Sequence, residues 1–169
     1  MSNRFKNFFN SSMALPPQPT LANVLLSGLG GFFAISVIAL AADYTQAVLI
    51  LGSFGASCVI VFALPDTPLA QPRDVILGHF LSSLSGLVYL NVFGPHWWAL
   101  GLAVATAIII MMACRVVHPP AGSNPVIVFL AAPGWSFLFF PTLIGACILV
   151  IVAMIYNNLV RKNKYPKYW

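Results

Sequence analysis

The chain has 169 residues, of which 60% are hydrophobic and 7% are charged, and its formal net charge is +5. A soluble domain carries roughly a quarter charged residues, so this composition excludes an ordinary soluble fold and predicts an integral membrane protein in a lipid bilayer. The positive charge comes without a basic groove of interleaved stacking residues, which argues against nucleic acid as a partner.

Six helical segments are predicted in chain order, because helices in lipid satisfy their own backbone hydrogen bonds and long uncharged stretches therefore indicate spans. Their approximate bounds are residues 21–42, 45–64, 74–93, 97–115, 118–132 and 136–158. Residues 1–20 are a predicted cytoplasmic tail with a stiff proline-rich linker, residues 21–158 form the transmembrane domain, and residues 159–169 form a basic cytoplasmic tail. The predicted fold class is an all-α polytopic transmembrane bundle.

The cations predict the orientation of this bundle. With six crossings and a cytoplasmic N-terminus, every Lys and Arg falls on the cytoplasmic side, while the outer connections keep Asp43 and no cation, as the positive-inside rule requires. A fifth segment that failed to cross would leave the cations of the C-terminal tail outside, so the charges favour one that reaches the other face. The cations are Arg4, Lys6, Arg73, Arg115, Arg161, Lys162, Lys164 and Lys167.

The two halves of the chain resemble each other. Val-Ile-Val-Phe at residues 59–62 recurs 67 positions later, at residues 126–129. Three further pairs match at this offset, namely Gly55 with Gly122, Ser57 with Asn124, and Gly78 with Gly145. Each predicted repeat, at about residues 21–93 and 97–158, holds three helices, so the second repeat is inverted relative to the first. Inverted repeats are typical of transporters whose site lies where the repeats meet, near mid-membrane.

The second predicted helix is interrupted by Gly-Ser-Phe-Gly-Ala-Ser at residues 52–57. Glycine weakens a helix and serine adds polarity, so we expect a polar break here. Ser53, Gly55 and Ser57 are therefore candidate substrate-binding residues. The alternative is that these small residues only allow close packing of helices, and this motif alone does not decide between the two interpretations.

The fifth segment opens with a more specific polar break, His-Pro-Pro-Ala-Gly-Ser-Asn-Pro at residues 118–125. Its prolines cannot donate backbone hydrogen bonds, and irregular backbone at membrane depth survives only where protein or water covers it. A helix that starts here presents free N–H groups and a positive dipole end, and with the helix that begins near Gly55 it would form an anion site. The alternative is a tightly packed re-entrant turn without a ligand. The candidate ligands are His118, Gly122, Ser123 and Asn124.

Two further side chains are candidates. Arg115 lies one turn before the second break, where it either places a fixed positive charge near an anion or snorkels to the cytoplasmic surface. His79 lies about a turn and a half into the third helix and either faces the pathway or only hydrogen-bonds to a neighbouring helix. The His and Asp residues show no metal-ligand spacing, and no nucleophile has a base beside it. We therefore expect no metal, no cofactor and no enzymatic activity.

The third predicted helix carries Gly78, Ser82 and Gly86 at four-residue spacing. Such a stripe predicts a face for close helix packing, either within the fold or between the subunits of a homo-oligomer. Asp74 is well placed to start this helix as a capping residue.

Three blocks of the sequence, in order, resemble the HPP family of integral membrane proteins. They are Gly-Ser-Phe-Gly-Ala-Ser at 52–57, Pro-Asp-Thr-Pro-Leu-Ala-Gln-Pro-Arg at 65–73 followed by Gly78-His79, and His-Pro-Pro-Ala-Gly at 118–122. The resemblance covers roughly residues 50–160. It departs from the family pattern at residues 123–125, where small or apolar residues are commoner.

Members of this family from cyanobacteria and chloroplast envelopes are associated with nitrite transport. The resemblance therefore implies a transporter of nitrite or a similar small inorganic anion that serves nitrogen assimilation in a bacterial inner membrane of the cyanobacterial type. An anion-binding or sensing membrane module without flux is the alternative. No carboxylate lies deep in a predicted span, so we do not expect proton coupling through Asp or Glu, whereas histidine-linked coupling, uniport and channel behaviour all stay open.

Overall fold

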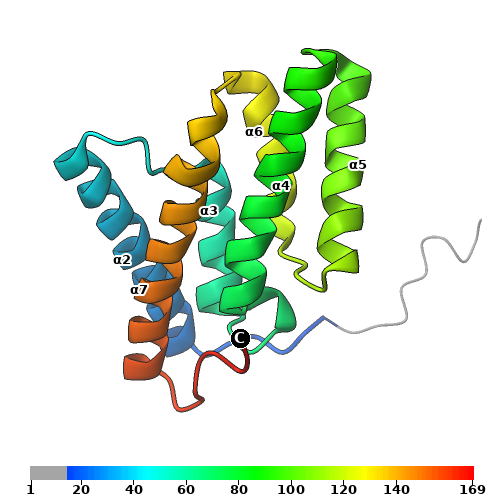
Figure 1. The fold of residues 1–169 in the computed structure, drawn as a ribbon. Coiled ribbons are helices and arrows are strands. Elements are labelled where there is room, and N and C mark those ends of the chain that lie inside the picture. Colours follow the sequence, from blue (N-terminus) through cyan, green and yellow to red (C-terminus); the bar gives the residue numbers. More distant parts are fainter. Residues whose placement is uncertain (1–14) are drawn as a thin grey trace, which may run out of the picture.

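The computed structural model describes residues 15–169, and within them every regular element is a helix. Successive helices run in alternating directions along one bundle (Figure 1). The longer elements are α2 (Leu21–Thr45), α3 (Gly52–Cys58) continued by the π-helical η1 (Val59–Ala63), α4 (Pro72–Phe93), α5 (Trp97–Ala113), η3 (Pro119–Ser123) continued by α6 (Asn124–Ala131), and α7 (Ile144–Val160). By length and composition, α2, α4 and the segment Trp135–Val160 are apolar enough to cross a membrane. The predicted all-α transmembrane bundle is confirmed.

The second half of the bundle repeats the first at the offset found in the sequence. Leu51 precedes the start of α3 and His118 precedes the start of η3; both are extended, and they lie 67 positions apart. Helices α4 and α7 end at Phe93 and Val160, which have the same separation. Figure 1 shows α3 and α6 running in opposite directions, as an inverted repeat requires.

Two glycines show the same register in three dimensions. A Cβ atom on Gly78 would lie 3.2 Å from the carbonyl oxygen of Val116, and one on Gly145 would lie 2.7 Å from the carbonyl oxygen of Leu49. Gly145 and Val116 are the counterparts of Gly78 and Leu49 at the 67-residue offset. Each half therefore packs on the other through an equivalent glycine, because only a residue without a side chain admits a backbone this close.

The second helical segment is shorter than predicted. It was expected at residues 45–64 with a polar break at residues 52–57, but α3 begins at Gly52 and runs without interruption to Cys58. The predicted break is therefore wrong, and these residues form the start of the helix. Gln46 takes a left-handed φ of 54° at the end of α2, and Leu51 is extended, so the chain between them is not helical. The late start sets which residues of α3 face the interior.

The last segment is interrupted near its beginning. A 3-10 turn, η4 (Trp135–Leu138), and a π-helical turn, η5 (Phe139–Leu143), come before α7. Phe140 has φ −126° and ψ 112°, outside helical geometry. The following Pro141 explains this, because proline disfavours a helical conformation in the residue before it.

The stripe of small residues on α4, Gly78, Ser82 and Gly86, packs against other helices of the same chain. The hydroxyl of Ser82 donates a hydrogen bond to the carbonyl of Ala121 at 2.6 Å. A Cβ atom on Gly86 would lie 2.9 Å from the Cα atom of Pro125. Of the two interpretations of this stripe, the structure therefore shows close packing of α4 on η3 and α6.

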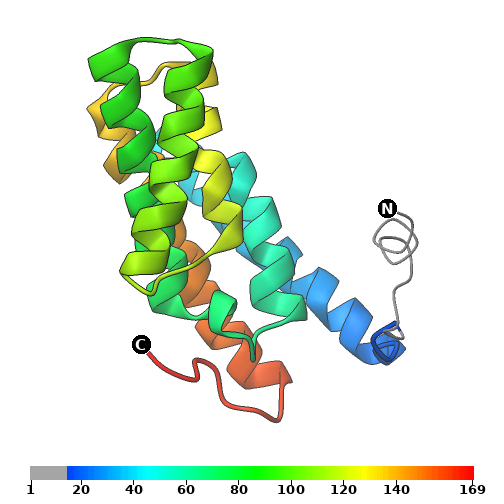
Figure 2. The ribbon, with the colours of Figure 1, turned by 90° about the vertical axis from the view of Figure 1, so that its right-hand side faces the viewer.

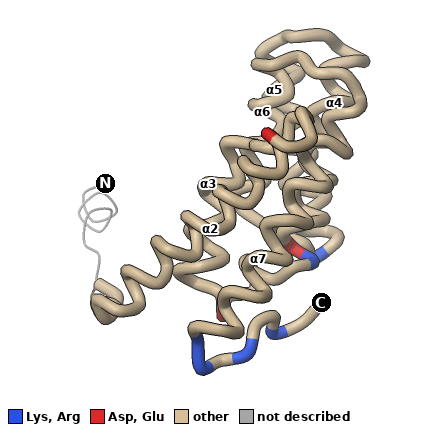
Figure 3. The backbone as a smooth tube through the Cα atoms, turned by 90° about the vertical axis from the view of Figure 1, so that its left-hand side faces the viewer, with Lys and Arg blue, Asp and Glu red and all other residues tan. Residues whose placement is uncertain are grey.

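The charged residues gather at one end of the bundle. Figure 3 shows the Lys and Arg residues of the described chain at the end that carries the C-terminus, which is called the cation-rich end below. Asp43 lies in the last turn of α2, at the opposite end of the bundle. Arg4 and Lys6, on which the predicted orientation also rests, lie outside the described residues.

Candidate functional site

A buried polar cluster lies where α3, α4 and η3–α6 meet. Its members Ser57, His79, His118 and Asn124 are all 0% exposed. The Oγ atom of Ser57 is 2.9 Å from Nε2 of His79 and 2.8 Å from Nε2 of His118. The amide nitrogen of Asn124 is 3.1 Å from Nδ1 of His79. Helix α3 packs on η3, the turn that leads into α6, and this cluster joins the two segments, which are teal and yellow in Figure 2.

The position of His118 follows from the proline after it. Pro119 excludes His118 from helical geometry, and the residue takes φ −124° and ψ 99° ahead of η3. Gly78 on α4 leaves the space that the imidazole side chain needs, since a Cβ atom there would lie 2.8 Å from Cβ of His118. The Nδ1 atom of His118 lies 2.8 Å from the carbonyl oxygen of Leu69, in the short turn η2 (Pro68–Ala70).

The cluster continues through two hydroxyls that the sequence analysis missed. The Asn124 amide donates to Oγ of Ser83 at 2.9 Å, and Ser83 lies 3.1 Å from Oγ1 of Thr142. The signal for Ser83 was present, because three serines occur within four positions, residues 82–85, of an otherwise apolar helix. Thr142 gave no such signal, since it stands alone among apolar residues.

Within residues 15–169, two buried side-chain atoms have no hydrogen-bond partner, Oγ of Ser53 and Oδ1 of Asn124. Buried polar atoms in proteins are nearly always hydrogen-bonded, so each exception needs a physical explanation. Both residues are among the predicted substrate-binding residues. Their free atoms are available to a bound ion or water, or to a second arrangement of the cluster.

The predicted glycines lie outside the cluster. Gly55 is exposed on α3 and Gly122 is half-buried on η3, and a Cβ atom on either would meet no atom within 4 Å. Ser123 is exposed, and its hydroxyl donates a hydrogen bond to the carbonyl of Pro120 at 2.8 Å. The two helix starts do not meet end to end, because it is the second turn of α3 that contacts His118.

A cavity of about 530 Å³ lies at the cation-rich end, next to the cluster. Its wall includes Arg73, Arg115 and Asp74, and also Leu69, whose carbonyl binds His118. Arg115 therefore lies in the wall of the cavity and not in the buried cluster. The cavity wall next to the cluster therefore holds two arginines and one carboxylate.

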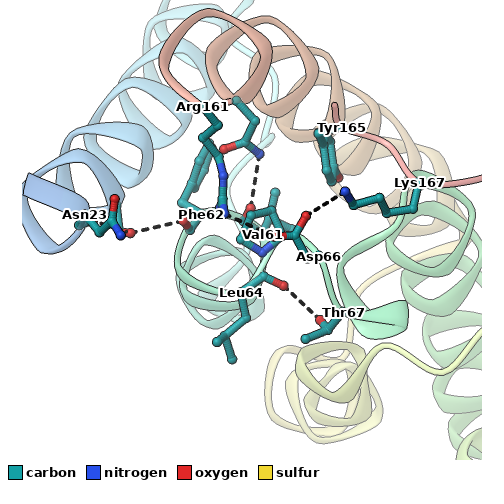
Figure 4. Close-up of polar contacts among 12 residues, drawn as sticks. Asn23, Val61, Phe62, Leu64, Asp66, Thr67, Arg161, Tyr165 and Lys167 are labelled. Atoms are coloured by element: carbon teal, nitrogen blue, oxygen red, sulfur yellow. Dashed lines mark hydrogen bonds and ion pairs between the residues drawn. The ribbon is translucent and has the colours of Figure 1, made fainter. Parts of the chain in front are cut away.

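The basic tail docks on the loop that precedes α4, beside this cavity. Figure 4 shows Arg161 and Lys167 converging on Asp66, with N–O distances of 3.2 and 3.0 Å. Tyr165 is buried, and its hydroxyl donates to the carbonyl of Ala70 at 2.7 Å. The hydrogen bond from Lys167, together with the charge of Arg161, holds the pKa of Asp66 below its ordinary value.

We expect Asp66→Asn to weaken this docking and to remove its dependence on acid. Exposed ion pairs contribute about 0–1 kcal/mol each, so the melting temperature at pH 7 falls only slightly. Because the pKa of Asp66 is lower in the folded protein, its pairs stabilise fully above the ordinary carboxyl pKa and are lost as the pH falls through the folded value. Melting temperatures in detergent at pH 7 and pH 3 measure this. An equal acid-induced loss in the wild type and in Asp66→Asn would contradict it.

Comparisons with known proteins agree with this architecture. Residues 16–166 match the family described as "HPP, transmembrane region". A transmembrane protein of Dictyostelium discoideum is 41% identical in an alignment 169 residues long, and this alignment covers 91% of this chain and 58% of the relative. A second transmembrane protein of that organism is 36% identical over 168 residues, which cover 91% and 53%. The chain thus spans just over half the length of these relatives, and no solved structure matches it.

The family match covers α3, η3, α6 and the whole polar cluster. The sequence resemblance rested on the blocks at residues 52–57, 65–73 and 118–122, and the structure brings these blocks together through Ser57, Leu69 and His118. On the extent of this match, the chain belongs to the HPP transmembrane family.

Proposed function

We propose that the protein transports a small inorganic anion, with nitrite as the substrate, through the buried polar cluster. One observation carries the proposal: hydrogen-bonding side chains from both inverted halves meet in an otherwise apolar membrane bundle. Polar groups at membrane depth are costly, and they mark substrate pathways and proton relays. Transporters built from inverted repeats bind their substrates where the repeats meet.

As part of this proposal, the cavity beside the cluster is the entrance for the substrate, and its charges favour an anion. Arg73 and Arg115 line the cavity beside the cluster, and a cleft lined by one sign of charge raises the local concentration of the opposite ion. Asp74 offsets part of this charge and accepts a hydrogen bond from Tyr168 at 3.0 Å. Inside, the Ser57 hydroxyl, the Asn124 amide and the imidazole N–H groups are the donors that would replace the hydration of the anion once it displaces their present partners.

The proposal includes an orientation and a location. The cation-rich end faces the cytoplasm, as the positive-inside rule predicts, so both termini lie in the cytoplasm. Nitrite as the substrate and nitrogen assimilation as the process rest on the family resemblance. The relatives found come from an amoeba and give no support to the bacterial inner membrane, which stays a prediction. The expected absence of a metal, a cofactor and an enzymatic activity also stays a prediction.

Uptake of nitrite into proteoliposomes tests the proposal. The wild type is expected to take up nitrite faster than protein-free vesicles, with a rate that saturates. Because its cluster is fully buried, a sensing module without flux is the second candidate. Saturable nitrite binding without uptake would favour the sensor and contradict transport.

We expect Arg115→Ala to raise the KM for nitrite about tenfold at low ionic strength, because it removes one of the two guanidinium groups of the cavity. The effect shrinks at high salt, since exposed charges are screened there. Lys164→Ala is the matched control, because it removes an exposed cation that does not line the cavity. An equal change in KM for both variants would show that general surface charge, and not the cavity, attracts the anion.

A further inference from the structure

The hydrogen bonds of the cluster form a directed chain. The carbonyl oxygen of Leu69 can only accept, so Nδ1 of His118 carries the hydrogen of that 2.8 Å bond. In a neutral imidazole the other nitrogen is then an acceptor. The Nε2 atom of His118 therefore accepts a hydrogen bond from the hydroxyl of Ser57, 2.8 Å away.

The same logic fixes the second histidine. The Ser57 hydroxyl has given its hydrogen to His118, so Oγ must accept from Nε2 of His79, 2.9 Å away. A neutral His79 then has its lone pair on Nδ1, which accepts from the Asn124 amide at 3.1 Å. Each bond between the two rings has one donor and one acceptor, while the Ser53 carbonyl oxygen, 3.1 Å from Oγ of Ser57, competes for the same hydroxyl hydrogen. The two imidazoles thus communicate through a single hydroxyl.

This arrangement can pass a proton from one imidazole to the other along the existing hydrogen bonds. A proton that reaches Nδ1 of His79 when the Asn124 amide turns away makes this ring an imidazolium. Its Nε2 proton moves to Oγ of Ser57 while the hydroxyl proton of Ser57 moves to Nε2 of His118. The result is a neutral His79 with its hydrogen on Nδ1, an unchanged serine hydroxyl and a positively charged His118.

The free oxygen of Asn124 fits the second state. After the transfer, Nδ1 of His79 is a donor and needs an acceptor where the Asn124 amide nitrogen stood. A rotation of the amide group would bring Oδ1 to that place, and Oδ1 is one of the two buried atoms without a partner within residues 15–169. The Asn124 amide can therefore accept a hydrogen bond through Oδ1 from the tautomer of His79 that carries its hydrogen on Nδ1.

We propose that the His79–Ser57–His118 chain carries one proton together with each anion. This inference rests on the transport function proposed above and names the co-transported ion. An anion is poorly accommodated in a medium of low dielectric constant, whereas an anion beside an imidazolium is neutral as a pair. The chain supplies this positive charge only while the anion is bound and needs no permanent cation in the core.

The surroundings leave the two histidines as the groups that hold the proton. Helix α3 contributes Ser57, which contacts both histidines, and Phe54, whose ring meets His79 edge-on. Helix α6 contributes the Asn124 amide, which contacts His79. The turn η2 contributes a carbonyl and η5 contributes Thr142 through Ser83. Cys58, next to Ser57, belongs to the apolar core. Among the described residues, the charged side chains that line the neighbouring cavity are Arg73, Asp74 and Arg115, and they make no hydrogen bond to the cluster.

The proton has a route to solvent at the cation-rich end. His118 donates to Leu69, and Leu69 lines the cavity together with Val117. A displacement of this carbonyl would expose Nδ1 of His118 to water in the cavity. The proton and the anion therefore use the same entrance.

Proteoliposomes that contain a pH-sensitive dye and are clamped at zero membrane potential test the inference. An inward nitrite gradient is expected to acidify the lumen of wild-type vesicles by about one proton per nitrite, after subtraction of the leak of nitrous acid in protein-free vesicles. Ser57→Ala is expected to lose at least tenfold in both fluxes, and Ser57→Thr, which keeps the hydroxyl, to restore them. Ser85→Ala is the matched control, because that buried hydroxyl bonds only to Ala103 in α5.

His79→Gln provides a second measurement if Ser57→Ala does not fold, as judged by size exclusion. Its amide can donate to Ser57 but cannot carry a proton, so an imposed pH gradient should no longer drive nitrite accumulation. Nitrite uptake without any proton movement in the wild type would overturn the coupling and leave transport intact. Unchanged nitrite and proton fluxes in Ser57→Ala, or an unchanged proton-to-nitrite ratio in His79→Gln, would overturn the relay. Absence of nitrite uptake would overturn transport and the coupling with it.

Discussion

His118→Ala is expected to reduce nitrite uptake to the level of protein-free vesicles and to lower the free energy of unfolding by about 2–5 kcal/mol. The imidazole is fully buried and joins Ser57 on α3 to the carbonyl of Leu69. Its removal leaves a cavity, and it also takes the hydrogen-bond partner from the Leu69 carbonyl and one of the contacts of Ser57 Oγ, which adds to the cost. The melting temperature in detergent and the uptake rate measure the two effects.

A pair of substitutions separates the structural role of His118 from its role in transport. His118→Asn keeps a donor near the position of Nδ1, so it should recover part of the stability through the Leu69 carbonyl while uptake stays at background. His96→Ala is the matched control, because His96 is exposed in the turn before α5. If His118→Asn regained full uptake, the second imidazole nitrogen would have no part in transport.

Gly78→Ala is expected to destabilise the protein by about 1–3 kcal/mol, the usual cost of overpacking, and to lower nitrite uptake strongly. The added Cβ would lie 2.8 Å from Cβ of His118 and 3.2 Å from the Val116 carbonyl oxygen, so the chain at these residues must move away from α4. Such a shift lengthens the hydrogen bond between His118 and Ser57, on which the cluster depends.

Gly28→Ala is the control for this prediction, because a Cβ atom at Gly28 meets nothing within 4 Å. Alanine is the better helix former by about 1 kcal/mol, so this variant should be as stable as the wild type or slightly more stable. Melting temperatures of both variants in the same detergent measure the contrast. Equal stability of Gly78→Ala and the wild type would show that the contact at His118 is loose.

The sequence was sufficient to predict the helices and the inverted repeat. Long apolar runs specify spans because lipid offers no alternative partner for the backbone. The 67-residue offset has a structural basis, because Gly78 and Gly145 each meet a backbone carbonyl of the other half, where no side chain fits. The break at residues 118–125 was also correctly located, since η3 begins at Pro119.

The contacts within the cluster could not be predicted in the same way. A glycine in a broken helix shows where the helix is weak, but it does not show which face is buried. Which side chains of α3 face the interior depends on the rotation of the helix about its axis. Ser53 and Ser57, which are four residues apart, share the buried face, while Gly55 lies on the exposed face. The approach of His79 to Ser57 and Asn124 depends on how α4 is rotated against its neighbours, whereas the stripe of small residues on α4 indicated only close packing.

The inverted register also decides where water can enter the bundle. Leu51 and Ala146 stand in the other half at the positions of His118 and His79, 67 residues away, and both are buried. A displacement of the Leu69 carbonyl would let water from the cation-rich end reach imidazole nitrogens, whereas the opposite half presents hydrocarbon at the equivalent depth. Narrow apolar constrictions exclude water, so the two ends of the bundle differ in how readily water could enter.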